Sequence, residues 1–316
     1  WKMLAASTKG VVPMLVLLGN TFDFWQSRRK HEKPEQTLAR LLEVHVEFTV
    51  ALREWIGAGG EISLVIGPRD QALVQPNAWG LLREVFPTIN VRAKGHWTHH
   101  FEEESAGIYA EHGGRWHPCQ RLRLGDRWPT RCTAQILMSE LGERLEPRFP
   151  WFDKLTTLAE LLRWLDVVLE DRQRRNYAEL LARLLRGTSL IAQIVAPWLE
   201  EKPAQWERLE KRENAALQLA GERLLIPRHR LSDSPLKPGI LIHSMTRTAG
   251  VLSSPEPDAP RILSPGTWCP TVMGDPHAAK VLQRLPYVEC HPDQKGSATA
   301  ELKEYLGERA KGANFP

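Results

Sequence analysis

The sequence predicts an α/β protein built around a parallel sheet. Two observations predict this class: short continuous apolar runs alternate with amphipathic segments, and glycine-rich loops follow the apolar runs. The chain has 316 residues, of which 42% are hydrophobic and 25% are charged, so its composition is that of a folded protein. Its length allows one large domain or two smaller ones, and neither needs disulfide staples.

The first third of the chain carries the strand and helix signals in alternation. Residues 11–18 form an apolar run with β-branched side chains, which predicts a buried strand. Residues 34–56 repeat apolar side chains at helical spacing and end at a glycine-rich stop. Residues 62–66 predict a second buried strand, and Asn77 is the predicted N-cap of a short helix over 77–85. This order is typical of a parallel α/β sheet.

The rest of the chain divides where its composition changes. Short strands are predicted over 88–93, 96–101 and 107–110, and leucine, arginine, glutamate and alanine then dominate residues 133–225, which predicts helices. Four strands are predicted after residue 227, at 239–243, 250–252, 261–263 and 285–289. We therefore divide the chain into a first part of an α/β core at 1–130, a helical insertion at 131–226 and a second part of the core at 227–316.

Charge and cysteine content narrow the class of protein further. The formal net charge of +4 is mild and does not require a nucleic-acid or membrane partner. The four cysteines form no Cys-x-x-Cys motif, so a reduced, cytoplasmic protein is predicted. The longest apolar stretch, 11–18, is interrupted by Pro13 and is far shorter than the ~20 residues of a membrane span, so no transmembrane segment is expected.

Four polar segments stand at the ends of predicted strands, where an α/β sheet gathers its ligands. They are Leu17-Leu18-Gly19-Asn20-Thr21-Phe22-Asp23, Val65-Ile66-Gly67-Pro68-Arg69-Asp70, Glu111-His112-Gly113-Gly114-Arg115, and His243-Ser244-Met245-Thr246 with the later Gly266-Thr267-Trp268. Because the carboxyl ends of parallel strands meet at one edge of the sheet, we expect these segments to lie together.

In this order the segments resemble those of the calcineurin-like metallophosphoesterases, above all the branch that includes the bacterial UDP-diacylglucosamine pyrophosphohydrolases. The resemblance covers residues 11–122 and 239–290, and residues 145–153 are similar to the start of a helical insertion in some relatives. It implies a layered α/β sandwich and, in the ancestral family, a centre of two divalent metals such as manganese, iron or zinc. It also implies that the family's first strand is missing from this chain.

The positions that hold metals in that family carry other residues in this chain. Asn20 stands where an aspartate bridges the two metals, and a neutral amide supplies an oxygen without a charge. Pro68 and Arg69 stand at the asparagine and histidine of the Gly-Asn-His-Asp motif. Proline has no side-chain donor atom, and arginine keeps its proton. Ser244 and Thr246 stand in place of two histidines, so we expect no metal or other cofactor.

A few positions retain the family residue. By the resemblance, His112 matches a metal ligand, while Asp23 and Asp70 match supporting acids. Arg69 and Asp70 are the positions equivalent to the family's catalytic segment. His243 falls at a glycine position, and a one-residue slip that made it a ligand would turn its side chain to the other face of the sheet.

Two further clusters have a functional and a structural interpretation. His96, His99 and His100, with His112 and His117 further on, suggest a replacement metal site on a hairpin, but their spacing matches no standard ligand pattern. We therefore favour hairpin residues packed against tryptophans. The basic stripe over 172–186 is interleaved with acidic residues, which favours a solvated helix face over a nucleic-acid site.

Two candidate binding surfaces remain. Arg69 and Arg115 are candidate anion-binding residues, because two guanidinium groups facing the strand ends would bind phosphate without hydrolysing it. The helical insertion 131–226 is the predicted protein-binding surface, because tryptophan is enriched at interfaces. The tryptophans in question are Trp151, Trp164, Trp198 and Trp206.

The leading hypothesis is a degenerate metallophosphoesterase-fold protein, a catalytically inactive pseudoenzyme that serves as a structural or regulatory subunit of a larger assembly. One alternative is a divergent metal-dependent phosphoesterase or pyrophosphohydrolase that uses His112, Asp70 and the arginines. A second alternative is a nucleic-acid-binding module that uses the basic helices of the insertion. Chelator-sensitive turnover distinguishes the first alternative, and steeply salt-dependent binding distinguishes the second.

Overall fold

A computed structural model describes residues 13–27, 31–92, 96–99, 107–113, 167, 170, 176, 238–244, 249–252, 261–266, 271–273, 280–282, 284–292 and 298–305. Within these residues the chain is a mixed α/β protein with parallel strand pairs and four α-helices, which confirms the predicted class. The domain boundaries at 130 and 226 and nearly all of the proposed insertion lie outside the described residues, so they stay predictions.

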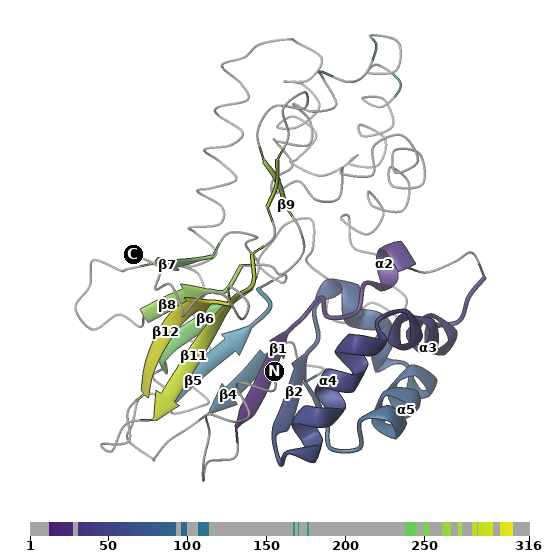
Figure 1. Cartoon of the computed structure of the whole chain (residues 1–316), viewed down its shortest axis with the longest axis horizontal. Helices are drawn as coiled ribbons and strands as arrows, with labels where there is room; N and C mark the ends of the chain where they lie inside the picture. The colour runs from purple at the N-terminus through teal and green to yellow at the C-terminus, as the bar shows by residue number, and fades with distance from the viewer. Residues whose placement is uncertain are drawn as a thin grey trace, which may run out of the picture.

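The first sheet has the strand order β1-β2-β3, and both of its pairs are parallel. The strands are β1 (Met14–Leu18), β2 (Glu61–Val65) and β3 (Asn90–Arg92). Helices α3 (Pro34–Val44), α4 (Val46–Gly57) and α5 (Pro76–Val85) lie on one side of this sheet (Figure 1). A short helix, α2 (Phe24–Ser27), follows the loop after β1, and the 3-10 helix η1 (Pro68–Val74) follows β2.

Two local predictions in this region were wrong. The single helix expected over 34–56 is two helices separated at His45, whose φ of −104° and ψ of 49° are not helical. The apolar spacing continues across the break, so periodicity alone did not reveal it. Helix α5 begins at Pro76 after Gln75, so Asn77 is not its N-cap; a proline in the first turn supplies the fixed φ and has no unsatisfied N–H.

The second sheet has the order β4-β5-β6-β8-β7. Its strands are β4 (His96–His99), β5 (Gly107–Glu111), β6 (Pro238–His243), β7 (Gly250–Leu252) and β8 (Arg261–Ser264). The central pairs β5–β6 and β6–β8 are parallel, although β5 and β6 are far apart in sequence. Two antiparallel pairs follow: β9 (Thr271–Met273) with β10 (Lys280–Leu282), and β11 (Pro286–Pro292) with β12 (Ala298–Glu304).

Two apolar cores cover the two faces of the first sheet. Alternate residues of β1 and β2 point to opposite faces, as the pleat requires. Leu15, Leu17, Ile62 and Leu64 pack with the helices in the first core, and Val16, Leu18 and Val65 pack in the second core. The second core continues through Ile108, Ala110, Ile240, Ile242 and Leu263 of the second sheet to Ala300 and Leu302 of β12.

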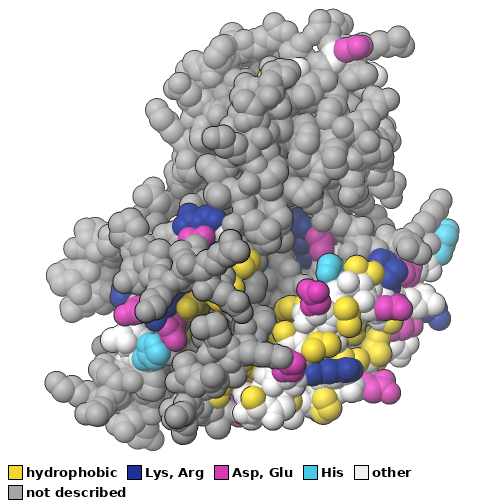
Figure 2. All heavy atoms as spheres, in the orientation of Figure 1, with side chains coloured by type: hydrophobic (Ala, Val, Ile, Leu, Met, Phe, Trp, Pro, Cys, Tyr) yellow, Lys and Arg dark blue, Asp and Glu magenta, His cyan; other side chains and the backbone are white. Residues whose placement is uncertain are grey.

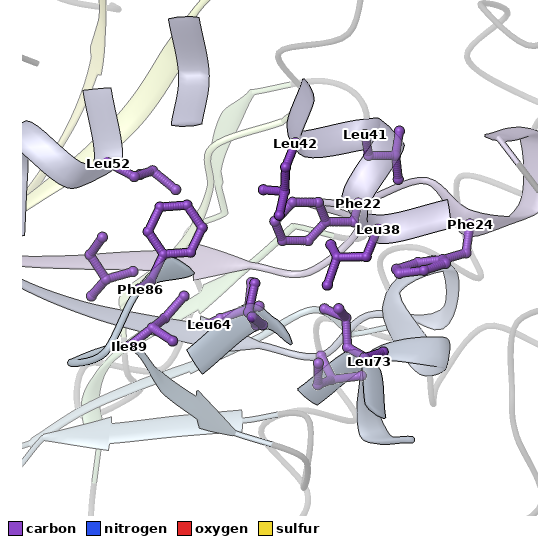
Figure 3. Close-up of a cluster of buried hydrophobic side chains, with 14 of the residues drawn as sticks. Phe22, Phe24, Leu38, Leu41, Leu42, Leu52, Leu64, Leu73, Phe86 and Ile89 are labelled. Atoms are coloured by element: carbon purple, nitrogen blue, oxygen red, sulfur yellow. The ribbon is translucent and has the colours of Figure 1, made fainter. Parts of the chain in front are cut away.

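The first core is densely buried. Leu38 of α3, Leu64 of β2 and Leu73 of η1 have no solvent exposure. Figure 3 shows side chains from α3 and from the loop after β1 pointing toward those of β2 and η1. Over α3–α5 the outer surface mixes apolar, acidic and basic side chains (Figure 2), as on an ordinary solvated face. No described helix is long and apolar enough to cross a membrane.

Replacing Leu38 by alanine tests this core. Leu38 has no exposed surface, so Leu38→Ala removes buried methyl groups and leaves a cavity, which should lower the free energy of unfolding by about 2–5 kcal/mol. Val44→Ala in the same helix is the matched control, since Val44 is 65% exposed and its truncation should change stability by less than about 0.5 kcal/mol. Urea unfolding followed by circular dichroism measures both. Equal losses would contradict the packing of α3 described above.

Candidate functional site

The ends of β1, β2, β5 and β6 converge on one region. A methyl group placed on Gly19 would lie 2.8 Å from Cα of Gly67 and 2.8 Å from Cδ2 of His112. From the end of β6, the Ser244 hydroxyl donates a hydrogen bond to the carbonyl oxygen of Leu18. The Ser244 amide donates to the carbonyl oxygen of Glu111 at 3.3 Å. The structure therefore brings together four predicted positions, which are Asn20, Pro68, His112 and Ser244.

Asn20 links the loop after β1 to the loop after β2. Its φ of 53° lies in the left-handed region, which asparagine tolerates better than most residues. Its side-chain oxygen Oδ1 accepts a hydrogen bond from the backbone N–H of Arg69 at 3.1 Å. The amide oxygen at the position of the bridging ligand therefore already has a partner in the protein.

Asp70 makes a second link between the same two loops. Its carboxyl group has no solvent exposure. Oδ1 accepts a hydrogen bond from the backbone N–H of Phe22 at 2.7 Å, and Oδ2 accepts one from the N–H of Gly67 at 3.0 Å. Burial raises the pKa of Asp70 to about 7, although hydrogen bonds from nearby backbone amides oppose the rise. With both oxygens bonded to backbone, Asp70 is a structural crosslink in this geometry.

Arg69 does not present a free guanidinium to an anion. Its Nη1 forms an ion pair with Oδ2 of Asp23, and its Cζ lies 5.5 Å from the ring centre of Trp25. Asp23 also accepts a hydrogen bond from the backbone N–H of Trp25 at 3.0 Å, through Oδ1. An anion would have to compete with Asp23 for this arginine. Arg115, its predicted companion, lies outside the described residues, so the anion-binding pair stays a prediction.

The described donor groups at the strand ends do not fit two divalent metals. Such a centre needs several anionic ligands around each ion. Here Pro68 offers no donor atom, the oxygen of Asn20 is held by an amide, and the Ser244 hydroxyl is turned to a carbonyl. His112 is present and 4% exposed, while Thr246 lies outside the described residues. Among the described side chains, no group of three or more His, Cys, Asp or Glu residues is placed to hold a metal.

The proposed histidine cluster is described only in part. His96 and His99 lie on β4, in register with Glu111 and Ile108 of β5. His100 and His117 lie outside the described residues. The replacement metal site that these residues suggested therefore stays a hypothesis.

The sequence reasoning missed a buried polar row next to the strand ends. Glu111 of β5 and His243 of β6 share one register position, and each is 1% exposed. The hydroxyl of Tyr109 donates to Oε2 of Glu111 at 3.0 Å. Neither ring nitrogen of His243 has a hydrogen-bond partner among the described residues, and burial lowers the pKa of His243 to about 4. The available signal was His243 itself, at the end of an otherwise apolar strand.

An unsatisfied buried histidine and a buried aspartic acid are both costly. A buried polar group without a partner costs about 1–3 kcal/mol, and burial penalises the charged form of either side chain. The strand-end region therefore contains two groups that burial holds in their neutral forms over part of the acid range. Their contributions to stability must depend on pH.

Comparison with known proteins gives no further identification. No known protein-family model matches the chain, and no curated protein sequence matches it. The likeness to the metallophosphoesterases therefore rests on the order and positions of the strand-end segments.

Crowding at the strand ends can be tested by replacing glycines with alanine. A methyl group on Gly67 would lie 2.6 Å from the nitrogen and 2.7 Å from Oδ1 of Asn20, so Gly67→Ala should destabilise the fold by about 1–3 kcal/mol. Gly80 in α5 has open space around it, so Gly80→Ala should stabilise the fold by about 1 kcal/mol through helix propensity. Thermal or urea unfolding compares the two. A Gly67→Ala protein as stable as the wild type would refute the close approach of these loops.

The pH dependence of stability tests both buried titratable groups. Between about pH 4 and 7 the folded state keeps a proton on Asp70 that the unfolded state releases, so this contribution to stability falls as the pH rises. Between about pH 4 and 6.5 the unfolded state protonates His243 while the folded state does not, so that contribution falls as the pH decreases. Relative to the wild type, His243→Leu should make stability decline more with rising pH. Asp70→Asn should make stability increase more with rising pH.

Urea unfolding at pH 4.5, 5.5, 6.5 and 7.5 measures the slopes for the wild type and both variants. The double variant is the control, because it removes both titrations, so its slope change should equal the sum of the two single changes. Slope changes of the same sign in the two single variants would contradict this account.

Proposed function

We propose that this protein is a catalytically inactive relative of the metallophosphoesterases, which serves as a structural or regulatory subunit of a larger assembly. The observation that carries the proposal is the hydrogen bonding of the strand ends to one another. Asn20 bonds Arg69, Ser244 bonds Leu18, and Asp70 bonds the loops on both sides. Polar groups that would otherwise be available to a metal or a substrate hold the protein together instead.

The crowding of the loops supports the same conclusion. The backbones of Gly19 and Gly67 approach so closely that neither position has room for a Cβ atom. Arg69 is neutralised by Asp23 and stacked over Trp25. A hydrolytic centre needs a nucleophile, charged groups that stabilise the transition state, and space for the substrate between them. At the strand ends, the side chains of Asn20, Asp70 and Ser244 already bond other groups of the protein.

A fold can persist after its chemistry is lost. The two cores on either side of the first sheet depend on apolar side chains and not on the strand-end polar groups. An assembly role would use a surface of such a stable body. The helical insertion 131–226 stays our proposed contact surface for a protein partner, with no nucleic acid required, and the cytoplasm stays the proposed location.

Metal content and hydrolysis test the proposal together. Full-length protein purified without chelators should contain well under one equivalent of manganese, iron and zinc by elemental mass spectrometry. It should also not hydrolyse bis(p-nitrophenyl) phosphate above background, with or without added Mn²⁺. About two equivalents of metal with turnover that EDTA abolishes would overturn the proposal in favour of a divergent phosphoesterase. In that event His112→Ala should remove the activity, which excludes a contaminating hydrolase.

A further inference from the structure

We draw no further inference here: the strongest candidate, the buried side-chain cluster of Glu111 and His243 at the ends of β5 and β6, belongs to the strand-end region already described, and nothing among the described residues shows what faces the two ring nitrogens of His243.

Discussion

The carboxyl group of Asp70 lies between the loop after β1 and the loop after β2, with no solvent contact, and each of its oxygens accepts a backbone hydrogen bond. The sheet ends before these two loops, so contacts between the loops themselves determine their separation. Removing the carboxyl group would leave the N–H groups of Phe22 and Gly67 buried without acceptors, which costs about 1–3 kcal/mol for each group. The Asn20–Arg69 bond, the Arg69–Asp23 pair and the approach of Gly19 to Gly67 all depend on that separation.

This constraint also determines what the strand ends can do. Glycine at positions 19 and 67 allows the loops to approach to contact distance, and Gly19 adopts a φ of 79° that other residues avoid. In many α/β proteins the same freedom lets the backbone approach a ligand. Here the backbone approaches another backbone, and the polar side chains bond one another across the contact. The same local sequence features therefore serve an intramolecular contact between two loops.

Much of the fold could be predicted from the sequence, because apolar periodicity reports burial. The runs at 11–18 and 62–66 correspond to β1 and β2, and the rule that parallel strands gather their ends on one edge predicted the meeting of Asn20, His112 and Ser244. The break at His45 could not be predicted, since apolar spacing continues through it. The partners of Arg69 lie more than 40 residues away in the chain, and no local pattern encodes such a choice. The isolation of His243 likewise depends on what packs around it and not on its neighbours in sequence.

His243 and Asp70 are two titratable side chains that this region buries at a cost in free energy. One is a buried imidazole without a hydrogen-bond partner among the described residues, and the other is a buried carboxyl whose pKa burial raises to about 7. Burial opposes the charge of each, so acid destabilises the protein through His243 and base destabilises it through Asp70. Over the range in which both titrate, the two effects cancel in part. A site under selection for catalysis uses such shifted groups in contact with substrate. Asp70 instead bonds only backbone amides in the described geometry. Its hydrogen bonds hold two loops in place, which offsets the free energy that burial of the carboxyl group costs.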